Sequence, residues 1–145
     1  MGFFDKFGAG GGKLRVELDQ RSAAAGGTIS GKVVFTGGKR AQKGTSLTVA
    51  LAQQDGGQYS VANLTKKEIH GPFVSEAGQV QEFPFELGIP TVVMNSAATI
   101  VNGKVAQTVL YAVWATADIP GEIDPNTHSE AFEVTGGVDV KITTG

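Results

Sequence analysis

Hydrophobic and polar residues alternate along much of the chain with a period of two. In the stretch 13–18, KLRVEL, the apolar residues Leu14, Val16 and Leu18 alternate with charged residues. Successive side chains of a β-strand point to opposite faces, so this pattern predicts a strand with one buried face and one solvent-exposed face. Similar stretches predict further strands at 28–35, 46–53 and 80–87.

Turn-forming residues separate the predicted strands. The Asp-Gly pair at 55–56 favours a hairpin from 46–53 into 59–69. Pro84 has no N–H to donate to a ladder, so we expect the 80–87 strand at an edge of its sheet or at a bulge. The stretch 106–119 predicts the longest strand, and because both of its faces are apolar we expect it at the centre of a sheet. Shorter strands are predicted near 98–101, 130–134 and 138–142.

This arrangement of about eight or nine short strands between turns predicts an all-β fold, namely a single antiparallel β-sandwich that is immunoglobulin-like or arrestin-like. A chain of 145 residues fits one domain. We expect the sandwich to comprise residues 13–145. Residues 1–12 form a separate Phe-rich segment with a glycine spacer, and we expect its first residues to be helical or extended.

Composition excludes several classes of function. The chain has no cysteine, which excludes disulfides and thiolate zinc sites. Its formal net charge is −2 and no block of like charge occurs, so the basic surface typical of a nucleic-acid-binding protein is missing. No apolar run approaches the roughly 20 residues of a membrane helix, and the start does not have the pattern of a signal peptide. We therefore expect a cytoplasmic protein that binds no nucleic acid, and membrane attachment is not favoured.

The N-terminal segment MGFFDKF offers the first candidate contact, formed by Phe3, Phe4 and Phe7. Seven residues cannot hold a helix alone in water, and three exposed phenylalanines are unusual on a soluble monomer. These rings are expected to pack on the chain's own sandwich, on another protein or a second copy, or on a membrane surface. Lys6 alone supplies too little positive charge for stable membrane attachment. The following glycine run lacks the spacing of a phosphate-binding loop and is interpreted as a flexible spacer.

An acidic break interrupts the stretch YAVWATADIPGEIDPNTHSEAFEV between two predicted strands. Its candidate residues are Asp118, Glu122, Asp124 and Asn126. Clustered oxygens suit a hard cation such as calcium, but the spacing matches no EF-hand loop. Asp-Pro and Asn-Thr pairs favour side-chain-to-backbone hydrogen bonds in turns. We interpret the break as the turn between two strands, with cation binding and partner contact as alternatives.

The remaining candidates do not form a catalytic pattern. His70 and His128 are far apart in sequence and are interpreted as exposed turn residues. Trp114 is interpreted as a core residue, with stacking against a sugar as the alternative. No G-x-S-x-G motif occurs, and no nucleophile–base or carboxylate pair has a usable spacing. We therefore expect no enzyme activity, no cofactor and no metal.

Three stretches resemble one protein family. They are the paired Phe residues and glycine spacer before LRVELDQ, the stretch GGTISGKVVFTGGKRAQK, and EFPFEL…IP followed by the acidic break. In their spacing they are similar to the bacterial sporulation-control, arrestin-like proteins. Within that family pattern a strand ends in an acidic-aliphatic pair, matched here by Asp118 and Ile119, and a linker leads to Asp124 and Pro125. The resemblance implies one arrestin-type β-sandwich lobe and a non-enzymatic adaptor or regulatory role. An arrestin has two sandwiches, whereas this chain has the length for one.

The leading hypothesis is therefore a non-catalytic protein-interaction module, a cytoplasmic scaffold or regulator. An exposed edge strand can accept a strand from another chain, and because Pro84 blunts one edge we expect pairing at the other end of the sandwich. One alternative is a structural subunit of a self-assembling complex. The other is a β-sandwich that binds a small ligand or carbohydrate.

Overall fold

The computed structural model describes residues 12–55, 58–61, 65–91, 94–100, 107–108, 110–136 and 138–143. Within these ranges the chain forms β-strands and loops with no α-helix, which confirms the predicted all-β class. Accordingly, these ranges contain no helix able to span a membrane. The candidates Phe3, Phe4 and Phe7 lie outside the described residues.

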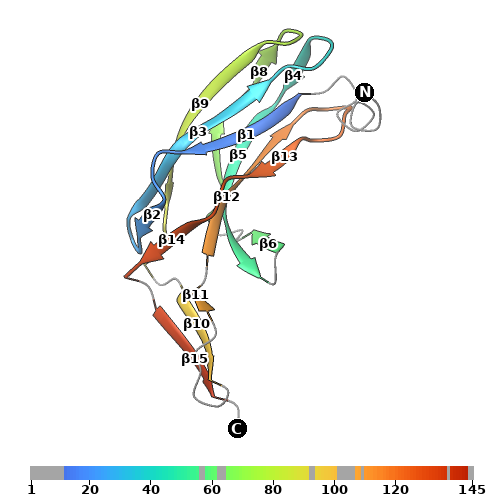
Figure 1. The fold of residues 1–145 in the computed structure, drawn as a ribbon. Coiled ribbons are helices and arrows are strands. Elements are labelled where there is room, and N and C mark those ends of the chain that lie inside the picture. Colours follow the sequence, from blue (N-terminus) through green and yellow to red (C-terminus); the bar gives the residue numbers. More distant parts are fainter. Residues whose placement is uncertain are drawn as a thin grey trace.

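The strands follow one another along the chain with short connections (Figure 1). They are β1 (Lys13–Leu18), β2 (Ser22–Ala24), β3 (Thr28–Thr36), β4 (Gln42–Gly44), β5 (Ser46–Asp55), β6 (Gln58–Val61), β7 (Lys67–His70), β8 (Phe73–Ser75), β9 (Val80–Gly88), β10 (Met94–Ile100), β11 (Gln107–Thr108), β12 (Leu110–Asp118), β13 (Asn126–His128), β14 (Phe132–Thr135) and β15 (Val138–Thr143).

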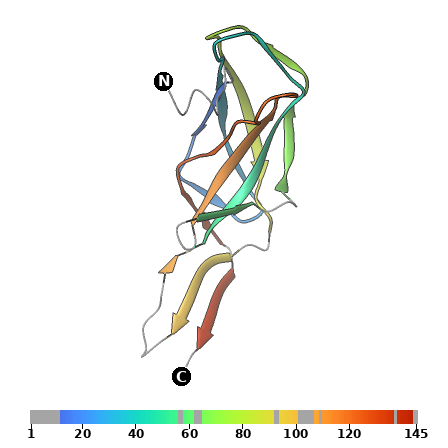
Figure 2. The same ribbon diagram turned by 90° about the vertical axis from the view of Figure 1, so that its right-hand side faces the viewer.

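Two sheets form the sandwich. The smaller sheet has the strand order β1-β3-β9, and the larger has the order β2-β14-β12-β5-β6, with β13 beside β12 and β7 beside β5. A two-stranded sheet of β4 and β8 lies at one end of the molecule, and a separate sheet of β11, β10 and β15 lies at the other (Figures 1 and 2). Most pairs are antiparallel, but β14 pairs with β2 and β10 pairs with β15 in parallel.

The longer predicted strands are confirmed. β1 has the predicted bounds, and β3, β5 and β9 extend the predicted ranges by one or two residues. Pro84 lies in β9 at an edge of its sheet, and β12 is central in the larger sheet, as expected. The stretch 106–119, predicted as one strand, also contains β11, which pairs with β10 in a different sheet. The Asp-Gly turn lies partly outside the described residues, but β5 and β6 pair antiparallel from Asp55 opposite Gln58.

Several shorter strands were not predicted. The predicted strand at 59–69 is instead divided between β6 and β7, which both pair with β5. β2, β4, β8 and β13 are each three residues long, too short to show an alternating pattern. β13 begins at Asn126 and so lies inside the acidic break, which therefore contains a short strand as well as a turn.

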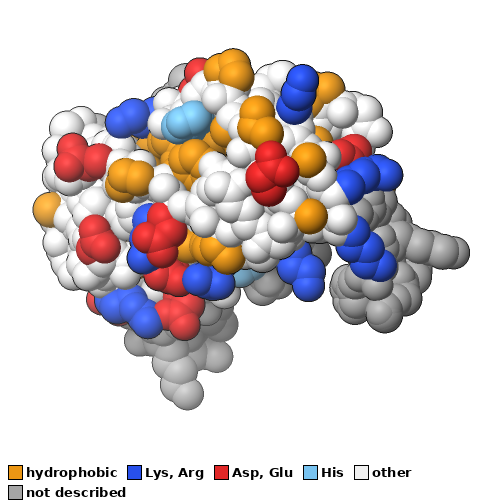
Figure 3. All heavy atoms as spheres, turned by 90° about the horizontal axis from the view of Figure 1, so that it is seen from above, with side chains coloured by type: hydrophobic (Ala, Val, Ile, Leu, Met, Phe, Trp, Pro, Cys, Tyr) orange, Lys and Arg blue, Asp and Glu red, His pale blue; other side chains and the backbone are white. Residues whose placement is uncertain are grey.

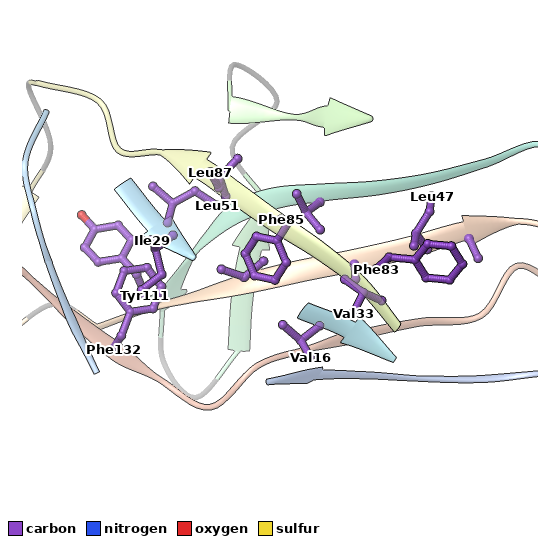
Figure 4. Close-up of a cluster of buried hydrophobic side chains, with 14 of the residues drawn as sticks. Val16, Ile29, Val33, Leu47, Leu51, Phe83, Phe85, Leu87, Tyr111 and Phe132 are labelled. Carbon is purple, nitrogen blue, oxygen red and sulfur yellow. The ribbon is translucent and has the colours of Figure 1, made fainter. Parts of the chain in front are cut away.

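The hydrophobic core lies between the two sheets (Figure 4). The inward faces of β3, β9, β5 and β12 supply most of its side chains, in the alternation that the sequence predicted. Ile29, Val33 and Phe35 of β3 are fully buried, and Phe83, Phe85 and Leu87 of β9 lie opposite the larger sheet. Burial of these apolar side chains is the main stabilising term of the fold.

Candidate functional site

β1 of the smaller sheet runs beside β13 of the larger one (Figure 1). Residues of both strands line an open groove of about 420 Å³. Its apolar lining comes from Leu14, Val16 and Leu18. Val16 is 8% exposed and the two leucines are half-buried, as expected for the inward face of a strand at the rim of the core. The opposite wall contains Thr127, His128 and Glu130.

The backbone of β1 leaves hydrogen-bonding groups free on the groove side. Among the described residues β1 pairs with β3 alone, and the N–H of Asp19 donates to the carbonyl of Ser30 at 3.0 Å. Hydrogen-bonded and non-hydrogen-bonded pairs alternate in an antiparallel ladder, so residues 13, 15 and 17 also bond to β3. The backbone groups of residues 14, 16 and 18 therefore face away from β3.

β13 presents a second free edge to the groove. The N–H of Ala117 donates to the carbonyl of Pro125 at 3.1 Å, and the N–H of Ser129 donates to the carbonyl of Val113 at 2.9 Å. By the same alternation, Thr127 bonds to β12, and the backbone groups of residues 126 and 128 point away from it. In the part of the chain that the structure describes, no strand pairs with this edge.

Charged residues of both signs surround the groove. Arg21 and Glu130, both exposed, form an ion pair at its rim. Arg15 Nε donates to Glu17 Oε2 at 2.7 Å, and this bond, helped by Lys32, holds the pKa of the Glu17 carboxyl below its ordinary value. Figure 3 shows acidic and basic side chains interspersed at the end of the sandwich that carries β4 and β8. At the rim of the groove, the two ion pairs place positive and negative side chains next to each other, so neither sign of charge dominates.

The acidic break forms a structured connection between β12 and β13. Asp124 Oδ1 accepts a hydrogen bond from the N–H of Ile119 at 2.9 Å, and Gly121 has a φ of 82°. Asp118 accepts a hydrogen bond from the Thr45 hydroxyl, and Asn126 begins β13. The carboxylates of Asp118 and Asp124 therefore have separate local partners. Within the described residues, no group of three or more His, Asp or Glu side chains is placed to hold a metal ion.

Glu122 has a different environment from the other acidic residues. Its side chain is 17% exposed, and its Oε2 accepts a hydrogen bond from Gln42 Nε2 at 3.0 Å. Arg40 lies 3.8 Å from its Oε1. Gln42 is 4% exposed and lies in β4, so this contact joins the acidic connection to β4.

The two histidines have separate aromatic neighbours. The ring of His70 makes edge contacts with Phe73 and Phe83. The ring of His128 stacks on Trp114 with centroids 5.8 Å apart and lies 4.5 Å from the ring of Tyr59. Both histidines are exposed, but they lie in β7 and β13 and not in turns.

The interpretation of Trp114 as a core residue is wrong. Its neighbours Val113 and Ala115 fill the core, whereas Trp114 is half-buried on the outer face of the larger sheet. The alternation along β12 requires this, because residues of opposite parity point to opposite faces. The aromatic group that Trp114 forms with His128 and Tyr59 could not be predicted from the sequence, because it depends on strands that are distant along the chain.

Comparison with known proteins supports the family resemblance. The family model described as SpoOM protein matches residues 2–135. No curated protein matches the chain. Among solved structures, Spo0M, a sporulation control protein from Bacillus subtilis, superposes with a TM-score of 0.67 at 22% identity, covering 85% of this chain and 49% of that one. The chain thus spans about half the length of that relative.

A β-glucosidase from Listeria innocua also superposes, but with a TM-score of 0.45 at 16% identity, covering 89% of this chain and 16% of that one. A superposition this weak carries no argument about fold or function. The match to Spo0M, in contrast, agrees with the predicted arrestin-like β-sandwich. Because the family model covers nearly the whole chain, the chain belongs to the Spo0M family.

Proposed function

We propose that the chain is a non-catalytic, cytoplasmic protein-interaction module that binds an extended segment of a partner protein in the groove between β1 and β13. The bound segment adds a strand to the free edge of β1. The observation that carries this proposal is that two strand edges face one groove and that neither pairs with another strand among the described residues. Regulation of another protein is a role that such binding supports, and the Bacillus subtilis relative is named a sporulation control protein.

Backbone pairing supplies the affinity in this arrangement. An incoming strand meets the free N–H and C=O groups of residues 14, 16 and 18, in the manner of strand addition to other sheet edges. The six residues of β1 span about 20 Å at roughly 3.3 Å per residue. A partner segment of about six residues therefore matches the length of the edge.

Side chains of the groove set the preferred partner sequence. Every second side chain of an added strand points toward Leu14, Val16 and Leu18, so alternate apolar residues fit there. The intervening side chains point to solvent near the paired charges of Arg15 and Glu17. An alternating apolar and polar segment with little net charge matches this surface.

The opposite edge of the smaller sheet is a poorer acceptor. β9 forms that edge, and Pro84 in its middle has no N–H. Proline on an edge strand is one of the devices by which proteins prevent unwanted strand pairing. The β1 edge has no proline and keeps all of its N–H groups. An added strand therefore pairs better with β1 than with β9.

A proline substitution tests the proposal directly. Leu14→Pro removes one N–H that faces the groove but keeps the β1–β3 hydrogen bonds, while Leu14→Ala removes the side chain and keeps the N–H. We expect a partner captured from native lysate by wild type and by the alanine variant, and lost by the proline variant. Hydrogen exchange on the complex should show protection of amides 14, 16 and 18. Equal capture by the proline variant, with unchanged melting, would contradict strand addition.

The N-terminal phenylalanines provide a second proposed contact. A version of the chain that starts at Lys13 lacks Phe3, Phe4 and Phe7 and can be compared with full-length protein in the same capture experiment. Loss of the partner only from the shorter version would place the contact in the N-terminal segment. Equal retention by both versions would place it on the sandwich and support the groove.

A further inference from the structure

A shallow hollow of about 170 Å³ lies on the outer face of the larger sheet, away from the groove. On that face Trp114 stands opposite Ala50, and Thr116 stands opposite Thr48, in the register of β12 and β5. Side chains directly opposite each other are about 5 Å apart at Cβ, so these four residues form a compact block. Lys66, from the connection between β6 and β7, lines the remaining side.

The indole of Trp114 is held in place from one side. The imidazole of His128 stacks on it at 5.8 Å with an interplanar angle of 29°. His128 Nδ1 lies 2.8 Å from the carbonyl oxygen of Ser129, and because a carbonyl only accepts, Nδ1 carries a proton and donates. His128 of β13 and Ala50 of β5 stand beside Trp114 on opposite sides of β12, and the hollow lies on the Ala50 side.

The hollow combines an apolar wall with polar groups that are available to a ligand. The hydroxyls of Thr48 and Thr116 can each donate and accept, and the ammonium of Lys66 can donate three hydrogen bonds. Within the described residues neither threonine hydroxyl forms a hydrogen bond. A ligand ring with one apolar face and hydroxyl groups at its edge can stack on Trp114 and also form hydrogen bonds with Thr48, Thr116 and Lys66.

We propose that this hollow binds a neutral carbohydrate, with one pyranose ring stacked by its C–H face on Trp114 and its hydroxyls bonded to Thr48, Thr116 and Lys66. The site shares His128 with the wall of the groove but does not require strand addition at β1. A pre-organised indole lowers the entropy cost of binding, because His128 already restricts its motion. A single sugar ring has few atoms, so we expect dissociation constants of about 1 mM.

Other ligand classes fit less well. Glu68 stands opposite Thr48 in the register of β5 and β7, so an anionic ligand would meet a carboxylate near Lys66. A nucleotide would bring a phosphate to a hollow that one lysine lines. A proline ring would cover the two threonine hydroxyls without pairing them, which costs free energy.

Intrinsic fluorescence gives a direct test, because Trp114 is the one tryptophan among 145 residues. The full chain is titrated with glucose, galactose, mannose and N-acetylglucosamine and with their short oligosaccharides, to about 10 mM, which is about ten times the expected dissociation constant. We expect a saturable change in emission with at least one of these sugars. No change with any of them overturns the proposal, and so does a saturable change with a proline-rich peptide alone.

Variants locate the bound sugar in the hollow. Thr48→Val/Thr116→Val removes both hydroxyls but keeps the β-branched shape, and we expect at least tenfold weaker binding. Thr28→Val and Lys43→Met, on exposed positions outside the hollow, are matched controls and should bind as wild type. His128→Ala should weaken binding although it does not contact the sugar. Wild-type affinity of the double threonine variant, with circular dichroism unchanged, would show that the sugar binds elsewhere.

Discussion

The hydroxyl of Ser129 and the N–H of Val113 form a hydrogen bond of 2.9 Å that ties the end of β13 to β12. Ser129 is 2% exposed, and its own N–H donates to the carbonyl of Val113. Its hydroxyl also donates to the carbonyl of Glu130 at 2.7 Å. Ser129 therefore fixes the position of the strand that forms one wall of the groove.

Removal of this hydroxyl should destabilise the fold. Ser129→Ala leaves the buried N–H of Val113 without its acceptor, which typically costs about 1–3 kcal/mol. We expect a lower urea midpoint with an unchanged slope. Ser22→Ala, on an exposed residue of β2, is the control and should change stability by less than about 0.5 kcal/mol. Equal midpoints for wild type and Ser129→Ala would show that another group satisfies this N–H.

Close approach of β1 and β3 requires a glycine at position 31. A Cβ placed there would lie 2.1 Å from the carbonyl oxygen of Glu17, so Gly31→Ala must push β1 away from β3. We expect a loss of about 1–3 kcal/mol, as for other overpacked sites. Gly88→Ala in β9 is the matched control, because nothing lies within 4 Å of its Cβ position. Similar unfolding midpoints for the two variants would contradict this account.

The alternating positions of β1, β3, β9 and β12 could be predicted from sequence because one face of each strand is buried. Pro84 also indicated an edge strand correctly, since the missing N–H is a local property. The groove could not be predicted, because it joins β1 to β13 across more than a hundred residues. β13 itself lacks apolar alternation, and its pairing relies on backbone groups and on Ser129.

Trp114 shows a different limit of sequence reasoning. β12 has apolar residues on both faces, so periodicity predicts a central strand without saying which face is covered. Ala112 and Ala50 on the outer face are buried, whereas Trp114 on the same face is half-buried. Lys66, which is distant from β12 in sequence, lines the hollow beside Trp114, and such a neighbour cannot be read from the periodicity of β12.

Charges beside β1 should make stability depend on pH at both extremes. Because the pKa of Glu17 is lowered in the folded state, its carboxylate stabilises the fold at pH values above its unfolded pKa of about 4.3. This stabilisation is lost as the pH falls through the folded pKa. The pKa of Lys32 is raised, chiefly by its hydrogen bond to Glu82, so its contribution is present below about 10.4 and is lost as pH rises through the folded pKa.

Urea midpoints measured between about pH 2 and pH 6 test the acid side of this prediction. Glu17→Gln should lose less stability than wild type as the pH falls. High salt should weaken the pH dependence of wild type, because Glu17 and its charged neighbours are exposed. Glu133→Gln, on an exposed residue of β14 outside this set of ion pairs, is the control. An identical pH profile for Glu17→Gln and wild type would exclude a contribution from this carboxylate.

The buried contact between Gln42 and Glu122 should stabilise the acidic connection. Gln42→Leu removes the donor to a carboxylate that is mostly shielded from water, and we expect a loss of about 1.5–3 kcal/mol. Arg40→Met should cost less than about 1 kcal/mol, because Arg40 is 67% exposed and 3.8 Å away. The double variant Gln42→Leu/Glu122→Leu should lose less than the sum of its single variants, since residues in direct contact are coupled. If the free-energy losses of the two single variants add up to that of the double variant, the amide and the carboxylate act independently. The connection would then be held by the Asp124 turn and the β12–β13 pairing alone.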